Sequence, residues 1–91
     1  MINNNVAFKG YIIVQDVDNK WSRPRLETDK ILKIEDRAQN TRITYDIDKE
    51  VRHNGYTYTE PTTICVNTPI SNVLAAYNAT KDTDITVDLS K

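Results

Sequence analysis

The chain has 91 residues, of which 38% are hydrophobic and 27% charged, and this length allows one domain with one core. Twelve basic and thirteen acidic residues give a formal net charge of -1, so no overall field marks a nucleic-acid binder. The two glycines, Gly10 and Gly55, cannot form the glycine-rich loops that hold nucleotide phosphates. We therefore expect a single domain over residues 1–91 that uses no cofactor.

The sequence carries no targeting signal that we recognise. Residues Met1–Asn5 lack the basic and apolar regions of a secretion signal, and no run reaches the roughly 18 apolar residues of a membrane span. The single cysteine, Cys65, cannot close a disulfide within the chain, which is typical of reducing compartments. We expect a cytoplasmic protein.

Abundant isoleucine, valine and threonine favour strands along most of the chain. An apolar run over Val6–Val17 predicts the first strand. Lys30–Asp36 predicts the second strand, with Leu32 and Ile34 on one face. Between these two strands, Ser22–Arg25 is predicted to be irregular, because Pro24 biases Arg23 away from helix.

The middle of the chain predicts two further strands. Thr41–Asp48 alternates polar residues with apolar residues that we expect to be buried, namely Ile43, Tyr45 and Ile47. A polar segment follows and ends in Asn54-Gly55, a turn signal because both residues tolerate a positive φ. Tyr56–Val66 then resumes strand character, and Pro61 indicates a bulge or an edge because proline cannot donate to a ladder.

One short amphipathic helix is predicted over residues 69–79. Thr68 fits the N-cap and Pro69 the first helical position. The apolar stripe of this helix, which must pack on the sheet or on another subunit, comprises Ile70, Val73, Leu74 and Tyr77. After the helix, alternation over Asp84–Leu89 predicts a closing C-terminal strand. The fold class is therefore α+β and strand-rich, a small antiparallel twisted sheet or half-open barrel covered by one helix.

Candidate catalytic and metal-ligating residues are few. His53, the only histidine, lies beside a turn without a serine or cysteine in a recognised motif, so we expect a solvated side chain rather than a hydrolase centre. Cys65 lies in an apolar strand and is expected to pack there. Asp46, Asp48 and Glu50 share a strand face, where we expect pairing with Lys33 or Arg42 across the sheet rather than a metal ion. The sequence predicts no enzyme and no metal site.

The most distinctive local cluster joins a tryptophan to three cations, namely Lys20, Trp21, Arg23 and Arg25. Such a segment can contact phosphates through its cations while a base stacks on the indole, which makes nucleic acid one candidate partner. The acidic pairs elsewhere in the chain repel a phosphate backbone. Alternatively, Trp21 anchors the loop on the core while the arginines remain solvated.

The stretch from Asp29 to Tyr77 carries a resemblance. An apolar strand is followed by a polar break and by Thr41-Arg42-Ile43, and Thr63-Ile64-Cys65-Val66 then leads directly into the helix. This order resembles the small FlbD-like proteins of flagellar operons and the short proteins encoded by phages and prophages of low-GC Gram-positive bacteria. The chain differs from that pattern in segment 52–61 and in its strand-like tail. The resemblance implies a phage or prophage protein, located in the host cytoplasm.

We therefore expect a non-enzymatic interaction module that self-associates as a homo-oligomer or binds a protein partner. Exposed strand edges are the candidate contacts, since an unpaired edge can add to a neighbouring sheet. The first candidate edge is the segment Tyr56–Pro61, and the second is the closing strand with Ile85, Val87 and Leu89. The alternative is a small nucleic-acid-binding accessory protein that uses the Lys20–Arg25 segment.

Overall fold

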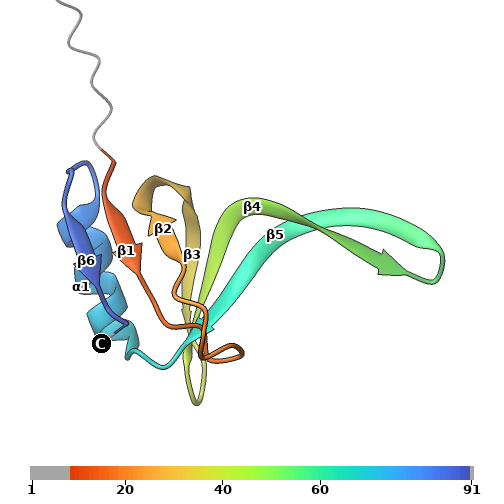
Figure 1. The fold of residues 1–91 in the computed structure, drawn as a ribbon, viewed down its shortest axis with the longest axis horizontal. Helices are drawn as coiled ribbons and strands as arrows, with labels where there is room; N and C mark the ends of the chain where they lie inside the picture. The colour runs from red at the N-terminus through yellow and green to blue at the C-terminus, as the bar shows by residue number, and fades with distance from the viewer. Residues whose placement is uncertain (1–8, 91) are drawn as a thin grey trace, which may run out of the picture.

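A computed structural model describes residues 9–90, whose strands form two separate three-stranded sheets. The first sheet has the order β2-β1-β6, in which β1 (Tyr11–Ile13) is central. Strand β2 (Arg25–Glu27) pairs with β1 antiparallel, and β6 (Thr86–Asp88) pairs with it parallel. This sheet therefore brings together the two ends of the described chain (Figure 1).

The second sheet is an antiparallel meander of β3 (Ile31–Asp36), β4 (Thr41–His53) and β5 (Tyr56–Val66). A 3-10 turn, η1 (Thr28–Lys30), leads from β2 into β3 and joins the two sheets. Helix α1 (Ile70–Thr80) follows β5 and packs on β1, β3 and β6. Neither sheet closes, and the α+β, strand-rich class is confirmed.

The core lies where helix α1 and the two sheets meet. Ile12, Ile43 and Val73 come from the two sheets and the helix, and each is fully buried. The Tyr45 hydroxyl in β4 accepts a 2.7 Å hydrogen bond from the Glu27 amide in β2, which ties the sheets together. The remaining buried apolar residues are Val14, Leu26, Ile31, Tyr45, Ile64, Val66 and Ala76.

Several sequence predictions are confirmed. Strand β5 spans Tyr56–Val66, and the helix begins and ends within a residue of its predicted range. Asn54 and Gly55 both have positive φ, as their turn requires. The pairing opposite Pro61 is bulged, and β5 lies at the edge of its sheet. The first predicted strand is shorter than expected, and its beginning at Val6 lies outside the described residues.

Other predictions are wrong. Leu32 was predicted to share a face with Ile34, and Ile47 was predicted to be buried, yet their exposed fractions are 56% and 51%, because each is an unpaired residue at a bulge. The stretch predicted to be irregular ends at Arg25, which is the first residue of β2. Pro69 rather than Thr68 is the N-cap residue, and the Thr68 carbonyl instead accepts a 2.8 Å hydrogen bond from the Thr41 hydroxyl.

A buried pair of hydroxyl groups joins the end of α1 to η1. The Oγ1 atoms of Thr28 and Thr80 lie 2.6 Å apart, and both side chains are buried. The Thr80 hydroxyl donates to the Ala76 carbonyl at 2.7 Å, so its oxygen accepts the Thr28 proton. The Thr80 hydroxyl therefore both donates and accepts a hydrogen bond, whereas the Thr28 hydroxyl only donates one.

We expect Thr80→Val to reduce the free energy of unfolding by about 1–3 kcal/mol, because the buried Thr28 hydroxyl loses its acceptor and the Ala76 carbonyl a donor. Thr28→Val leaves the bond from Thr80 to Ala76 intact and should cost less, about 1 kcal/mol or below. Urea unfolding followed by circular dichroism measures both variants. Equal losses would contradict the assigned donor order.

The edge strand β3 is held to β4 by a surface ion-pair cluster centred on Glu35. Arg42 Nε lies 3.0 Å from Glu35 Oε1, and Lys33 Nζ lies 3.4 Å from Glu35 Oε2. The hydrogen bond from Arg42, helped by Lys33, lowers the pKa of the Glu35 carboxyl below its ordinary value of about 4.5.

Because the pKa of Glu35 is lower in the folded protein than in the unfolded chain, the ionised carboxylate stabilises the fold at pH values above the unfolded pKa. This stabilisation is lost as the pH falls through the folded-state pKa. We expect Glu35→Gln to remove this part of the acid dependence. Melting temperatures between neutral pH and pH of about 3 compare the two proteins. If their difference stays constant across that range, the ionised Glu35 side chain contributes nothing to folding.

Candidate interaction surface

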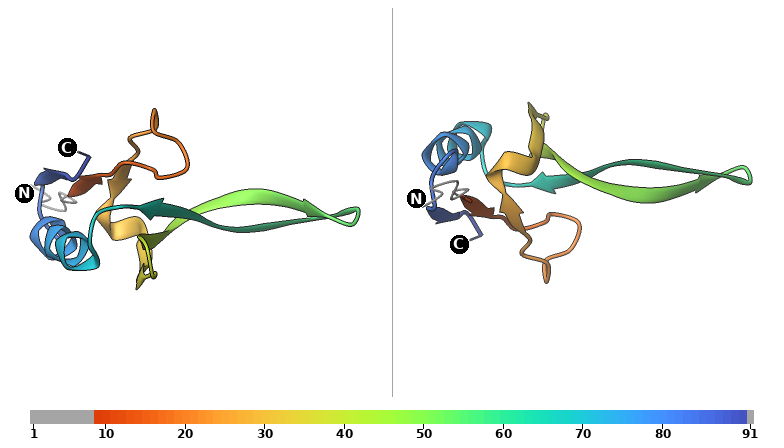
Figure 2. Two further views of the ribbon diagram at one scale, coloured as in Figure 1. Left: turned by 90° about the horizontal axis from the view of Figure 1, so that it is seen from below. Right: turned by 90° about the horizontal axis from the view of Figure 1, so that it is seen from above.

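The two long strands of the second sheet continue beyond the core as a free ribbon (Figure 1). We call residues 46–61, the outer parts of β4 and β5 with their turn, the arm. The molecule measures 55 × 31 × 23 Å, and its radius of gyration is 15.0 Å, against about 12 Å for a compact chain of this length. Figure 2 shows the arm extending away from the rest of the protein in both further views.

A bulge marks the boundary between the arm and the core. Tyr45 pairs with Thr62 and Asp48 pairs with Pro61, so two β4 residues lie opposite none of β5. The Thr62 hydroxyl donates a 2.6 Å hydrogen bond to the carbonyl of Ile47, one of those two residues. Bulges increase the local twist of a ribbon and bend it, so this one directs the arm away from the core.

The two faces of the arm differ in chemistry. Val51 pairs with Tyr58, and His53 pairs with Tyr56, so these four side chains share one face. We call this the aromatic face, and its tyrosines are 76% exposed at Tyr56 and 48% exposed at Tyr58. The opposite face is polar and carries Asp48, Glu50, Arg52, Thr57 and Thr59.

Both basic residues of the arm pair with carboxylates of the arm, and one of these pairs, Lys49 with Glu60, lies on the aromatic face. Lys49 Nζ lies 3.7 Å from Glu60 Oε1, and Arg52 Nε lies 3.5 Å from Glu50 Oε1. The expected pairing of the carboxylates with Lys33 or Arg42 is wrong, because those two cations bind Glu35 instead. Four acidic and two basic residues leave the arm a formal charge of -2.

Trp21, Lys20 and Arg23 lie in an ordered loop between β1 and β2, and Arg25 is the first residue of β2. We call residues 15–24 the Trp21 loop. The Gln15 side-chain amide donates to the carbonyls of Asn19 and Ser22 at 3.2 and 3.0 Å, and the Trp21 amide donates to Asn19 Oδ1 at 3.0 Å. The Val17 amide donates to the Cys65 carbonyl at 2.8 Å, which fixes the loop to β5.

Trp21 is 85% exposed, so the alternative in which it anchors the loop on the core is wrong. Lys20 Nζ lies 5.2 Å from the centre of its ring. Arg23 donates from Nε to Gln15 Oε1 at 3.3 Å, and the Arg25 guanidinium lies 3.9 Å from the centre of the Tyr11 ring. The structure thus presents the indole to solvent while each of the three cations has a contact within the chain.

The second predicted edge is β6, which ends the first sheet. Val87 and Leu89 are partly buried against the core, whereas Ile85 is 49% exposed. The edge is only three residues long, so it offers a shorter contact than the arm.

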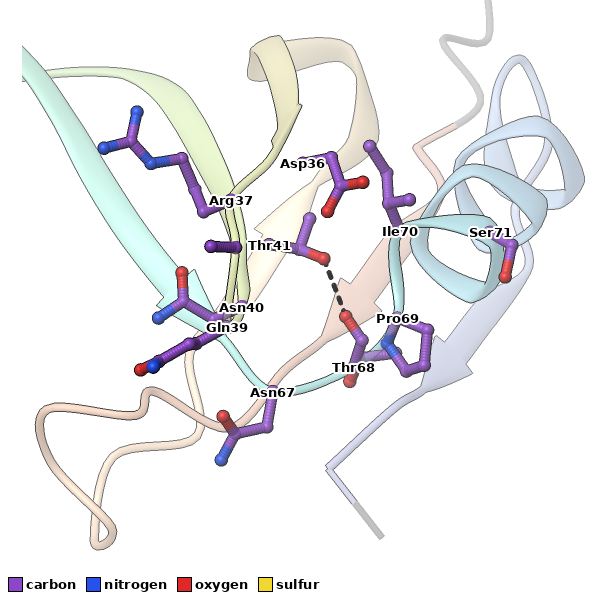
Figure 3. Close-up of a pocket in the computed structure, with 11 residues that line it drawn as sticks. Asp36, Arg37, Gln39, Asn40, Thr41, Asn67, Thr68, Pro69, Ile70 and Ser71 are labelled. Carbon is purple, nitrogen blue, oxygen red and sulfur yellow. Dashed lines mark hydrogen bonds between the residues drawn. The ribbon is translucent and has the colours of Figure 1, made fainter.

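A shallow pocket of about 280 Å³ lies between the β3–β4 turn and the start of helix α1 (Figure 3). Its labelled side chains are mainly amides and hydroxyls, together with the charged groups of Asp36 and Arg37, and the hydrogen bond from the Thr41 hydroxyl to the Thr68 carbonyl crosses it. Among residues 9–90, no group of three or more histidine, cysteine or acidic side chains is placed to hold a metal ion. His53 is exposed at the tip of the arm with its Nε2 atom 3.2 Å from the Asn54 side-chain amide, and Cys65 is a half-buried free thiol.

The described part of the chain includes no helix with the length and apolar character of a membrane span. No protein-family model, curated protein or solved structure matches this chain. The functional interpretation therefore depends on the geometry of the arm and the Trp21 loop.

The sequence indicated only part of this surface. Segment Tyr56–Pro61 was predicted as an edge, but its pairing with Asp48–His53 and the resulting aromatic face were not predicted. The alternation of Tyr56 and Tyr58 opposite Val51, counted outward from the Asn54-Gly55 turn, is the signal that identifies this face.

Proposed function

We propose that this protein is a non-enzymatic interaction module that acts by self-association or by binding a protein partner, and that the arm is its contact element. The observation that carries this proposal is the exposed aromatic face of an arm that projects beyond the core. A phage or prophage origin remains a prediction from the resemblance.

Physical reasons favour a partner for the arm. A two-stranded ribbon that projects from its sheet has no second layer over either face, and its apolar side chains gain nothing while they are hydrated. Tyrosine is enriched at the centres of protein interfaces because it buries a large rigid ring and keeps a hydroxyl for hydrogen bonding. Tyr56 and Tyr58 lie side by side on one strand face, so a partner can cover both at once.

We expect the double substitution of Tyr56 and Tyr58 by serine to leave the core folded and to weaken association by about tenfold or more. The matched control replaces Thr57 and Thr59, on the opposite face of the same strand, by serine. Sedimentation velocity over a concentration series measures self-association, and affinity capture from lysate of the source cells measures a different partner.

Loss of either association in the tyrosine variant, with retention in the threonine variant, would support the arm as the contact element. The proposal fails if the unmodified protein neither self-associates nor captures a partner. It also fails if the tyrosine variant behaves as the unmodified protein does.

A small nucleic-acid-binding accessory protein is the second candidate, favoured by the exposure of Trp21. A base can stack on the free indole while Lys20 and Arg23 contact phosphates. Against this reading, Arg23 already bonds to Gln15 and Arg25 lies on the ring of Tyr11.

If nucleic acid is the partner, single-stranded oligonucleotides should quench Trp21 fluorescence, with an affinity that falls as the salt concentration rises. Lys20→Ala should reduce the slope of this salt dependence, whereas the double tyrosine variant should retain the quenching. Absence of quenching at low salt rules out the Trp21 loop as a nucleic-acid site.

A further inference from the structure

We propose that two copies of this chain join through the free backbone edge of β4 in the arm, with the two strands antiparallel about a two-fold axis at Val51. This inference rests on the proposed function, because it names a second copy as the partner of the arm. It uses the edge of the ribbon and leaves the aromatic face uncovered. Among residues 9–90, β3 pairs with β4 only as far as Tyr45, and residues 46–53 pair with β5 alone. We call the side of residues 49–53 that points away from β5 the outer edge.

The turn at the tip of the arm determines which backbone groups the outer edge offers. Asn54 and Gly55 form a two-residue turn with positive φ at both positions, and in such a hairpin the two flanking residues exchange both backbone hydrogen bonds. His53 therefore directs its amide and carbonyl toward β5. Because this direction alternates along a strand, the amides and carbonyls of Glu50 and Arg52 point outward, where a further strand can pair with them.

The opposite edge of the arm, formed by β5, is less suited to pairing. The same alternation directs the backbone groups of Thr57, Thr59 and Pro61 outward. The bond from the Val17 amide to the Cys65 carbonyl agrees with this direction, because Cys65 lies an even number of residues from them. Proline has no amide hydrogen to donate, and proline on an edge is a common protection against strand addition. The arm therefore has one blocked edge and one open edge.

The side chains along the outer edge complement a second copy of themselves. A two-fold axis at Val51 places Glu50 of each copy directly opposite Arg52 of the other. An axis at Glu50 would place two glutamates opposite each other, and an axis at Lys49 would place Asp48 opposite Glu50. Within one arm, Glu50 and Arg52 are paired at 3.5 Å, but their side chains are 60% and 82% exposed and can also reach a partner. A second copy supplies this matched charge pattern by symmetry, whereas an unrelated strand has to match it by its own sequence.

This register also continues the aromatic face across the joined sheet. Val51 is half-buried beside Tyr58 of its own arm, and the valines of the two copies lie directly opposite each other. The joined sheet then carries a row of two valines flanked by two tyrosines on one face. Neighbouring β-branched and aromatic side chains on adjacent strands stabilise a sheet, so the apolar residues favour the same register as the charges.

The antiparallel arrangement keeps the two cores and the two acidic segments apart. The arm extends away from the rest of the protein in all three views, so each core lies beyond the tip of the other arm (Figures 1 and 2). Asp46 and Asp48 lie opposite residues 54–56 of the second copy, which form the turn and carry no charge. The formal charge of -2 on each arm is therefore not concentrated where the strands pair.

Exchange of the two charges tests the register. Arg52→Glu and Glu50→Arg each bring like charges opposite each other, and we expect each to raise the dissociation constant of self-association about tenfold or more. An equimolar mixture of the two variants should form a mixed dimer, because opposite charges then meet between copies although neither variant regains the ion pair within its own arm. Circular dichroism confirms that each variant is folded, and light scattering after size-exclusion chromatography gives the mass.

The matched controls place charges on the same polar face but on β5. Thr57→Glu and Thr59→Arg lie directly across the arm from Arg52 and Glu50, and neither faces the second copy. We expect both to associate as the unmodified protein does. Weakening by the controls as much as by the edge variants would attribute the effect to overall charge and overturn the register.

A site-specific crosslink provides the second measurement. In a Cys65→Ser background, Val51→Cys should form a disulfide-linked dimer under mild oxidation, because opposed residues that do not exchange backbone hydrogen bonds have Cα atoms about 4.5 Å apart. Lys49→Cys, the next residue on the same face, should not link to itself, because it lies opposite His53 of the second copy. A crosslink by Glu50→Cys in place of Val51→Cys would overturn the inferred register.

The outcomes separate this inference from the proposed function. If the unmodified protein is monomeric and Val51→Cys gives no crosslink, the second copy is ruled out, and the proposed function stands when the arm tyrosines capture a different partner. If the protein self-associates through Tyr56 and Tyr58 while the charge variants and the crosslink have no effect, the arm is the contact element and edge pairing is overturned.

Discussion

Gly10 lies so close to the last turn of helix α1 that a Cβ atom there would come within 2.0 Å of the Thr80 carbonyl oxygen. Only glycine permits this approach without displacing backbone. The Gly10 carbonyl accepts a 3.0 Å hydrogen bond from the Thr28 amide, and the Thr28 and Thr80 hydroxyls meet beside it. Three segments remote in sequence are thus held at one point. Because η1 leads directly into β3, this junction also sets the position of the second sheet, and so the direction in which the arm leaves the body.

Local sequence patterns predicted most of the elements but not where the core ends. Apolar and polar residues continue to alternate along β4 through Ile47 and Val51. Nothing in this pattern shows that the core packed against β4 ends at Tyr45. The bulge at Leu32 inserts one residue into β3 and reverses which of its residues face inward, and the bulge at Asp46–Ile47 inserts two residues into β4. Each bulge depends on pairing with another strand. A period-two pattern shows which residues share a face, but it does not show what covers that face.

The sequence also did not show whether Trp21 is buried or exposed. A single tryptophan among cations fits a core anchor and a contact residue equally well, because large aromatic residues are usually but not always buried. The loop stays ordered without burying the indole because Gln15 and Asn19 satisfy its backbone groups from within. Hydrogen bonds from polar side chains hold this loop in place of apolar packing. These bonds form only when the loop has folded back on itself, so the sequence pattern does not reveal them.

The arm lies apart from the buried core. Among residues 9–90, every buried residue lies on the core side of the bulge after Tyr45, so substitutions on the aromatic face should leave the core folded. The ladder to β5 and the Asn54-Gly55 turn hold the arm in an extended form before contact. A preformed ribbon loses little backbone entropy on binding, so more of the free energy from covering its tyrosines remains as affinity.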